Sequence, residues 1–129
     1  MRVHLDTDFL VHALGRAGPE RQRLLQLADS DALVEISAVA WYELVRGPRT
    51  PQQLAVARSF FPEDGGVVPF SEELALRAAE VFRLLGSPRK RAADIAIGVT
   101  ASVMGATLLS RNPRDFKGIP ALELEVVGE

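Results

Sequence analysis

The chain has 129 residues, with 15 lysines and arginines against 17 aspartates and glutamates, and it contains 0 cysteines. Its length suits one domain with a single core, and its 47% hydrophobic and 25% charged residues are those of an ordinary globular protein. The lack of cysteine excludes a disulfide scaffold, a thiolate nucleophile and zinc sites built on thiolates. We expect a single domain over residues 1–129.

The first half of the chain alternates short strands with helices. Hydrophobic spacing and capping residues predict strands at 3–5 and 33–36, and helices at 7–14, 19–29, 38–46 and 51–61. Thr7 or Asp8 is expected to cap the first helix, and Ser37 the third. The first strand would then deliver Asp6 at its carboxyl end.

The second half continues the same alternation. We predict strands at 67–70, 107–110 and 122–127, and helices at 72–85 and 90–104. Pro69 favours an edge position for its strand, because proline cannot donate to a sheet ladder. The helix at 90–104 is apolar on nearly all sides beyond Asp94, which predicts a central buried helix. Together the elements predict a three-layer α/β/α fold with a central, mostly parallel sheet of about five strands.

No membrane or export signal is visible. Met1 leads directly into a strand pattern without the basic and apolar regions of a signal peptide. The longest apolar stretch, residues 92–109, is shorter than the roughly 20 residues that span a bilayer, and it contains Asp94. We therefore expect a cytoplasmic protein that does not enter the membrane.

Four acidic residues map to the same edge of the predicted sheet. Asp6 ends the first strand, and Glu43 lies on the helix after the second. Asp94 starts the buried helix, and Asp115 follows the strand at 107–110. In open parallel sheets, ligands bind at the carboxyl ends of the strands. Two carboxylates about 4 Å apart repel by roughly 4 kcal/mol at an effective dielectric near 20, so four in one pocket require a cation.

The ligand type indicates which cation. Oxygen ligands without cysteine or histidine suit Mg²⁺ or Mn²⁺ rather than zinc. Such ions assist the in-line hydrolysis of phosphodiester bonds. Taken singly, each acid also has a structural explanation: a helix or turn cap for Asp6, Asp94 and Asp115, and an ion pair with Arg46 for Glu43.

Taken together, four segments resemble a known family. They are Leu-Asp-Thr-Asp at 5–8, Ser-Ala-Val-Ala-Trp-Tyr-Glu-Leu at 37–44 followed by Gly47, Ala-Asp-Ile-Ala-Ile at 93–97, and Leu-Leu-Ser-Arg-Asn-Pro-Arg-Asp-Phe at 108–116. In order and spacing they look like the signature blocks of PIN-domain ribonucleases, in particular the VapC-like toxins of type II toxin–antitoxin systems. The resemblance covers essentially the whole chain, and the fourth segment is its most specific part.

The resemblance implies a Mg²⁺-dependent (or Mn²⁺-dependent) endoribonuclease, inhibited by a cognate antitoxin protein and usually a homodimer. It assigns catalysis and metal binding to Asp6, Glu43, Asp94 and Asp115, with Asp6 and Asp94 as direct ligands. The RNA substrate is expected to contact Ser110, Arg111, Asn112 and Arg114, and the Arg89-Lys90-Arg91 run is a further place to hold phosphates.

The chain departs from the family pattern at two positions. Asp8 stands where the family more often has asparagine, so it could add a fifth carboxylate. Ser110 replaces a commoner threonine and keeps the hydroxyl. The aromatic residues Trp41, Tyr42, Phe60 and Phe61 are expected in the core or at a dimer contact.

Two other functions compete with this interpretation. One is a catalytically inactive PIN-like module that only binds a partner, which the intact set of four acids disfavours. The other is a small phosphatase of the haloacid dehalogenase type, which also begins with Asp-x-Asp after its first strand. This chain lacks the later acidic motif and the cap insertion of such phosphatases.

Overall fold

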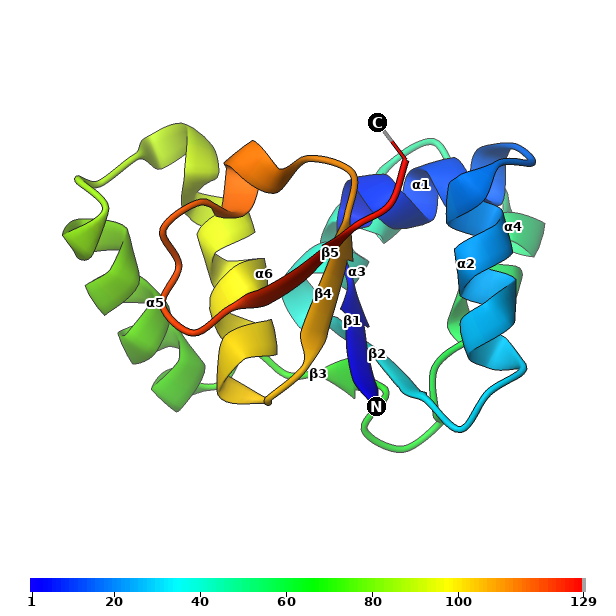
Figure 1. Ribbon diagram of the computed structural model, residues 1–129, viewed down its shortest axis with the longest axis horizontal. Helices are drawn as coiled ribbons and strands as arrows, with labels where there is room; N and C mark the ends of the chain where they lie inside the picture. Colours follow the sequence, from blue (N-terminus) through cyan, green and yellow to red (C-terminus); the bar gives the residue numbers. More distant parts are fainter. Residues whose placement is uncertain (129) are drawn as a thin grey trace.

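The computed structural model describes residues 1–128 as an α/β fold (Figure 1). Its strands are β1 (Arg2–Leu5), β2 (Leu33–Ser37), β3 (Val67–Val68), β4 (Thr107–Ser110) and β5 (Glu123–Val126). Its α-helices are α1 (Thr7–Gly15), α2 (Pro19–Ala28), α3 (Ala38–Arg46), α4 (Pro51–Ser59), α5 (Glu72–Leu84) and α6 (Ala92–Val103). Two short 3₁₀ helices, η1 (Arg89–Arg91) and η2 (Pro113–Phe116), complete the elements. Within the described residues, none of the helices is long and apolar enough to cross a membrane.

The five strands form one sheet in the order β3-β2-β1-β4-β5, and every neighbouring pair is parallel. In the register, His4 of β1 lies opposite Glu35 of β2 and Leu108 of β4. The predicted parallel sheet of about five strands is confirmed. All carboxyl ends therefore lie along one edge, where loops and helix starts gather.

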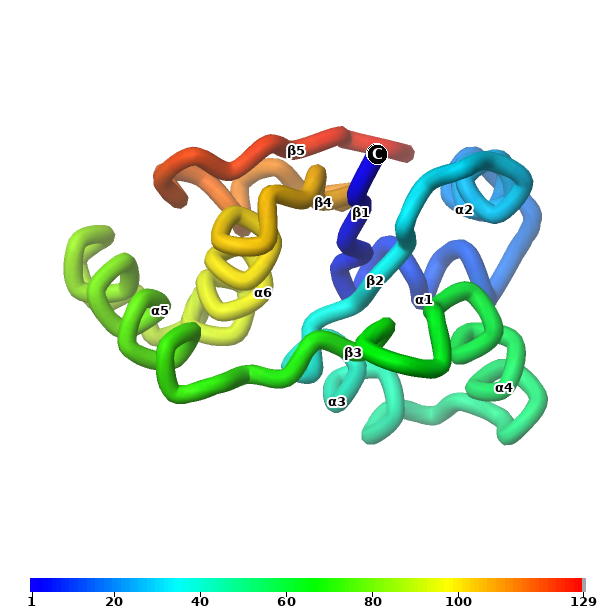
Figure 2. Tube along the Cα trace, turned by 90° about the horizontal axis from the view of Figure 1, so that it is seen from below, coloured from blue at the N-terminus to red at the C-terminus, as the bar shows by residue number. Residues whose placement is uncertain are grey.

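Helices cover both faces of this sheet, as the predicted three layers require. Figures 1 and 2 show α5 and α6 on one side, and α1, α2 and α4 on the other. Helix α3 lies beyond the carboxyl edge and contacts both α1 and α6. It thus joins the two helical layers at the end of the sheet that carries the predicted acids.

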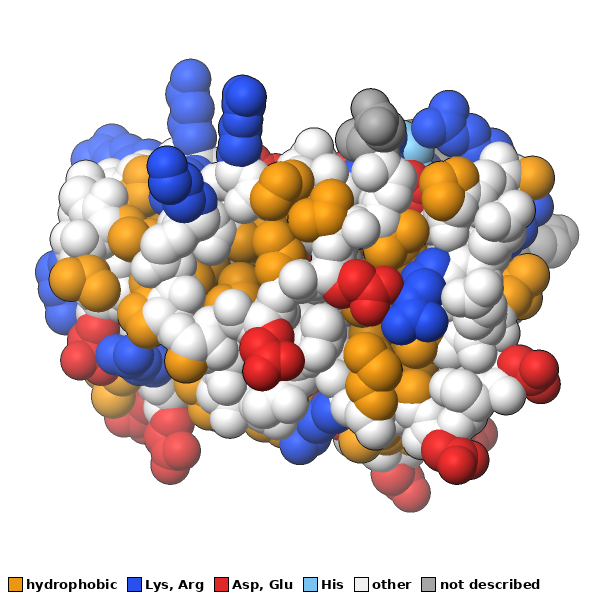
Figure 3. Space-filling model, viewed as in Figure 1, with side chains coloured by type: hydrophobic (Ala, Val, Ile, Leu, Met, Phe, Trp, Pro, Cys, Tyr) orange, Lys and Arg blue, Asp and Glu red, His pale blue; other side chains and the backbone are white. Residues whose placement is uncertain are grey.

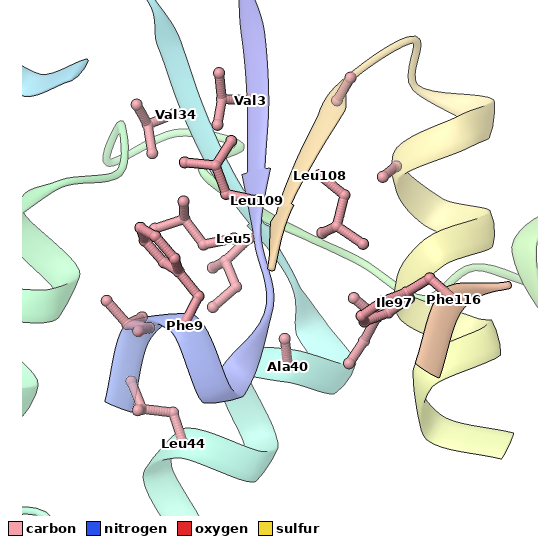
Figure 4. Close-up of a cluster of buried hydrophobic side chains, with 14 of the residues drawn as sticks. Val3, Leu5, Phe9, Val34, Ala40, Leu44, Ile97, Leu108, Leu109 and Phe116 are labelled. Atoms are coloured by element: carbon pink, nitrogen blue, oxygen red, sulfur yellow. The ribbon is translucent and has the colours of Figure 1, made fainter. Parts of the chain in front are cut away.

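The core follows the alternation of side chains along the central strands. Leu108 and Leu109 of β4 are both fully buried, and Figure 4 shows them pointing to opposite sides of the strand. Leu109 lies on the side of Phe9 from α1, whereas Leu108 faces Ile97 from α6. A strand buried on both faces is apolar at successive positions, which is why two leucines follow each other at 108 and 109.

Several predicted boundaries differ from the structure by one or two residues, and three differences have a clear physical reason. The cap of α1 is Asp6 rather than Thr7 or Asp8, because the Asp6 carboxylate accepts the amide of Phe9 at 2.7 Å. The strand predicted at 67–70 pairs only over Val67 and Val68, since proline at the next position has no N–H to donate. The helix predicted to start at 90 begins at Ala92, after the 3₁₀ turn η1, in which the Arg91 amide donates to Pro88 O at 2.8 Å.

A buried charged cluster lies away from the carboxyl edge, on β1 and β2. The Arg2 guanidinium donates to both oxygens of Glu35, at 2.7 and 3.1 Å, and His4 Nε2 lies 2.9 Å from Glu35 Oε1. His4 is only 1% exposed, and its Nδ1 has no hydrogen-bond partner among the described residues. Burial lowers the pKa of His4, against the hydrogen bond and charge of Glu35.

Gly98 lets the η2 region approach α6 closely. A Cβ atom at this position would lie 2.5 Å from Cδ1 of Ile119 and 3.3 Å from Cδ1 of Phe116. Glycine therefore lets these side chains pack directly against this helix, next to the segment that contains Asp115. Asp94 lies one helical turn before Gly98, on the same face of α6.

Candidate metal and active site

The four predicted acids come together at the carboxyl edge of the sheet. They line one surface depression of about 280 Å³. Its lining residues are Asp6, Thr7, Asp8, Val11, Glu43, Arg46, Asp94 and Asp115. The residues come from α1 and its N-cap, the second half of α3, the start of α6 and η2, which are far apart in the sequence. We call this depression the carboxylate pocket.

Asp6 is the most buried of the four acids, at 4% exposure. Its backbone amide continues the sheet by donating to Leu109 O at 3.1 Å, and its side chain caps α1. Burial raises the pKa of Asp6 to about 6, although the Ser110 hydroxyl and the Phe9 amide donate to its carboxylate and oppose the rise. The charges of Asp8 and Asp115 raise the pKa further.

Asp94 shows that the acids interact with one another. Its burial, followed by the charges of Asp115, Glu43 and Asp6, raises its pKa to about 7. The charge of Arg91 lowers the pKa of Asp94, but this effect is smaller than those that raise it. A carboxyl group shifted this far by burial and three like charges lies in a pocket that holds more negative charge than the protein compensates.

Glu43 is positioned from α1 as well as from its own helix. Its Oε1 accepts the hydroxyl of Thr7 at 2.7 Å, and its Oε2 lies 3.8 Å from Arg46 Nη2. The ion pair expected from the i,i+3 spacing is therefore present alongside the pocket position. Thr7 was not among the predicted site residues, although it lies next to Asp6 at the helix start.

Asp115 is held in place through its backbone. Arg91 Nε donates to Asp115 O at 3.2 Å, and Arg91 Nη2 donates to Lys117 O at 2.6 Å. These bonds and the packing at Gly98 fix η2 against α6. The Asp115 side chain lines the carboxylate pocket, where its charge raises the pKa of both Asp6 and Asp94.

The chemistry of these donors fits a hard divalent cation. Within residues 1–128, no group of three or more His, Cys, Asp or Glu side chains has a geometry that could hold a metal ion without rearrangement. The Asp6 carboxylate caps α1, and Glu43 is bonded to Thr7. Repulsion between like charges also opposes a closer arrangement of the carboxylates without a cation. The pocket offers oxygen ligands only, as Mg²⁺ and Mn²⁺ prefer.

Asp8 is turned toward the β4–η2 loop rather than left free as a fifth carboxylate. Its Oδ2 accepts Arg111 Nη1 at 3.2 Å and Asn112 Nδ2 at 3.1 Å. His12 Nδ1 lies 3.4 Å from Asp8 Oδ1, one helical turn away. A guanidinium, an amide and an imidazole thus surround this carboxylate.

Arg111 also binds a carboxylate that no sequence motif indicates. Its Nε donates at 3.0 Å to Glu20 Oε2, on α2, and Glu20 is only 2% exposed. Burial works to raise the pKa of Glu20, but its own backbone amide and Arg111 outweigh it, so the pKa is lowered. The predicted RNA-contacting role of Arg111 therefore competes with two internal partners.

The other predicted RNA-contacting residues lie in different surroundings. Ser110 is fully buried, and its hydroxyl accepts the Asn112 amide at 3.0 Å. Asn112 is exposed, and its side chain donates to Asp8. Arg114 is exposed at η2, beside the carboxylate pocket. Of the four, only Arg114 has a charged group that points to solvent.

The aromatic residues divide between the core and the surface. The rings of Trp41 and Phe61 pack edge to face, with centroids 6.3 Å apart. Phe60 lines an apolar groove of about 310 Å³ together with residues of α1, α2 and α4. Tyr42 is 63% exposed, and Arg46 stacks over its ring at 5.4 Å.

Comparison with known proteins agrees with this fold. The family model of the PIN domain matches residues 3–122. A chain of the VapBC2 complex from Rickettsia felis, solved with a promoter DNA fragment, superposes with a TM-score of 0.77 and 24% identity, over 98% of this chain and 99% of that one. DNA-bound VapBC from Salmonella typhimurium gives a TM-score of 0.72 and 20% identity, over 97% of each chain. FitAcB from Neisseria gonorrhoeae gives a TM-score of 0.67 and 23% identity, over 95% of this chain and 96% of that one.

Comparison with curated protein sequences gives no match. The parallel α/β/α sandwich with acids at its carboxyl edge defines the class of protein. The chain belongs to the PIN domain family. Its fold is that of chains in VapBC toxin–antitoxin complexes, which confirms the resemblance found in the sequence.

Proposed function

We propose that the protein is a Mg²⁺- or Mn²⁺-dependent endoribonuclease that acts as the toxin of a toxin–antitoxin pair. The observation that carries this proposal is the convergence of Asp6, Glu43, Asp94 and Asp115 on one pocket. The raised pKa values of Asp6 and Asp94 support it, because they reveal uncompensated negative charge. Membership in the PIN domain family supports a nuclease.

Each residue of the pocket has a definite task in this proposal. Asp6 and Asp94 would hold the metal ion, with Glu43 and Asp115 completing the ligands directly or through water. The chemistry supplied by a bound Mg²⁺ or Mn²⁺ is activation of a water molecule and neutralisation of charge on the phosphate. Thr7 orients Glu43 by its 2.7 Å hydrogen bond, and Arg46 offers a cation at the rim of the pocket.

The geometry disfavours a phosphatase of the Asp-x-Asp type. In such an enzyme, one aspartate attacks phosphorus and the other protonates the leaving group. Here Asp6 is 4% exposed and caps a helix, and Asp8 is bound by Arg111 and Asn112. Neither carboxylate is free for those roles.

The experiment is RNA cleavage by the purified protein. We expect cleavage of single-stranded RNA with Mg²⁺ or Mn²⁺, none with EDTA, and none by Asp94→Asn. Cleavage that persists in EDTA would contradict the metal mechanism. Hydrolysis of p-nitrophenyl phosphate without RNA cleavage would favour the phosphatase. A protein that binds a partner but hydrolyses neither substrate would favour an inactive PIN-like module.

The proposed partner is an antitoxin protein, as in the complexes with the same fold. The apolar groove between α1, α2 and α4 is a surface for its docking, since its lining is mostly apolar and Leu25 and Val56 in it are 54% and 51% exposed. We expect Leu25→Glu to abolish copurification with the product of the adjoining small gene. Unchanged copurification would place the antitoxin elsewhere.

A further inference from the structure

A group of cations lies beside the carboxylate pocket. The 3₁₀ helix η1 contributes Arg89 and Lys90, and the η2 region contributes Arg114 and Lys117. Arg91 brings the two short helices together, because it donates to the backbone oxygens of Asp115 and Lys117. We call these four cations, Arg89, Lys90, Arg114 and Lys117, the basic ridge.

The side chains of the basic ridge are exposed and uncommitted. All four are exposed, and within residues 1–128 none forms an ion pair or a side-chain hydrogen bond. Other arginines of the chain are used internally: Arg2 binds Glu35, and Arg23 binds Glu125. Figure 3 shows Lys and Arg side chains projecting into solvent at the upper left, where η1 and η2 lie in Figure 1.

The basic ridge adjoins the acids along the chain and lies outside the lining of the carboxylate pocket, with Arg114 and Lys117 in a neighbouring depression. Asp94 follows η1 by one helical turn, and Asp115 lies within η2. The whole chain carries a net charge of −2, so its overall field does not attract a polyanion. Any attraction for phosphates near the pocket must come from local cations. These four are the uncommitted cations of η1, which leads into the helix of Asp94, and of η2 and its C-cap, which carry Asp115 and Lys117.

We propose that the basic ridge binds the phosphodiester backbone of single-stranded RNA and leads it onto the carboxylate pocket. This inference rests on the proposed function, since it assigns that site its substrate track. Lys and Arg side chains bind a polyanion by neutralising phosphates and releasing counterions. Without such cations, the acids of the pocket would repel an approaching strand.

The contacts are to the backbone and not to the bases. The aromatic residue of η2, Phe116, is 3% exposed, and η1 contains none, so the described part of the ridge offers no ring for base stacking. Two turns of 3₁₀ helix also present no long helix or strand to enter a duplex groove. We infer that binding along the ridge is independent of base sequence.

The test measures binding separately from cleavage. Wild-type protein is titrated into a fluorescently labelled single-stranded RNA in EDTA, and anisotropy is followed at several salt concentrations. Lys90→Ala, Arg114→Ala and Lys117→Ala should each weaken binding severalfold. Each should also reduce the slope of log K against log salt by about 0.7, the value for one phosphate contact on a single strand.

Arg77 provides the matched control. It is an exposed arginine on α5, where its Nη1 lies 4.0 Å from Glu80 Oε1 in a solvent-exposed ion pair, and it lines a depression with Val68, Val103 and Met104. Arg77→Ala removes the same charge, so binding and slope should stay close to wild type. Equal losses in Arg77→Ala and the ridge variants would overturn the proposal, as would ridge variants that bind like wild type. Melting curves verify that each variant is folded.

The outcomes separate the two proposals. If the ridge variants lose RNA binding in EDTA but wild type cleaves no RNA with Mg²⁺, the proposed RNA-binding role of the ridge is supported and the proposed nuclease activity is contradicted. If wild type cleaves RNA and the ridge variants bind and cleave RNA as well as wild type does, the nuclease activity is supported and the role of the ridge is contradicted. Ridge variants that bind RNA normally but lose an antitoxin would make the ridge a protein contact and overturn the inference.

Discussion

Arg111 Nη1 donates to Oδ2 of Asp8 at 3.2 Å, and this bond ties the first turn of α1 to the loop that leads into η2. Asp6 precedes this turn and Asp115 follows this loop. The pair therefore fixes the separation of two pocket acids. It also directs the negative charge of Asp8 toward a guanidinium rather than toward a cation in the pocket.

Asp8 should behave as a positioning residue and not as a metal ligand. Asp8→Asn keeps an oxygen that can accept from Arg111, so we expect it to retain most of the stabilisation by Mg²⁺. A ligand variant such as Asp94→Asn should lose most of it. Thermal melting of both variants against Mg²⁺ concentration decides the question, since a cation that binds only the folded state raises its stability by RT ln(1 + [L]/Kd). An equal loss in the two variants would make Asp8 a ligand.

Replacing Asp94 should stabilise the metal-free protein while abolishing cleavage. Ionised Asp94 is opposed by burial and by the charges of Asp115, Glu43 and Asp6, and Asp94→Asn removes that conflict. The variant should melt above wild type in EDTA and gain much less from Mg²⁺. If the four acids had unrelated structural roles, loss of the helix-start charge of Asp94 would instead cost a few tenths to about 1 kcal/mol. A variant that melts below wild type, with no Mg²⁺ response in either protein, would refute the pocket.

The advantage of Asp94→Asn in EDTA should depend on pH. Burial and three like charges raise the pKa of Asp94 from its ordinary value of 3.8 to about 7, so the folded state favours the protonated carboxyl. Wild type therefore loses stability as pH rises from about 4 to 7, while the amide does not titrate. We expect the two melting temperatures to differ most above pH 7 and to converge near pH 4. A constant difference would contradict the raised pKa.

His4 should impose the opposite pH dependence. Burial lowers its pKa below 6.5, so the unfolded chain takes up a proton that the folded state resists, and stability falls as pH drops through 6.5. His4→Gln keeps an N–H donor for Glu35 and does not titrate. Urea unfolding of both proteins between about pH 7.5 and 5.5 should show a loss specific to wild type, limited to about 1.4 kcal/mol per pH unit for one proton. Parallel profiles would contradict this.

A homodimer remains our prediction for the oligomeric state. Trp41 and Phe61 pack against each other inside the protein, which leaves Tyr42, at 63% exposure, and Val45, at 42%, as apolar side chains of α3 that face solvent. Light scattering should give twice the chain mass of 14.0 kDa. Tyr42→Glu should shift the protein toward the monomer, and the groove variant Leu25→Glu should not. A wild-type mass of one chain would refute the dimer.

The sequence predicted where the four acids lie better than it predicted the hydrogen bonds and ion pairs around them. Carboxyl ends of parallel strands share an edge, so the positions of Asp6 and Asp115 follow from the alternation of elements alone. The sequence does not predict that Glu20 is buried, because its partner Arg111 lies 91 residues away in the sequence. Likewise, Asp6, Thr7 and Asp8 are all suitable caps. The bond of the Asp6 amide to Leu109 in the sheet holds Asp6 where its carboxylate can accept the Phe9 amide and cap α1.

Gly98 gives a way to change the packing beside the pocket without changing its charge. A Cβ atom there would press on the side-chain ends of Ile119 and Phe116, next to the segment that carries Asp115. Alanine and valine at this position would increase that pressure in steps, while every carboxylate and the net charge of −2 stay as they are. The dependence of cleavage on the packing of η2 against α6 can thus be measured at a residue that has no functional group of its own.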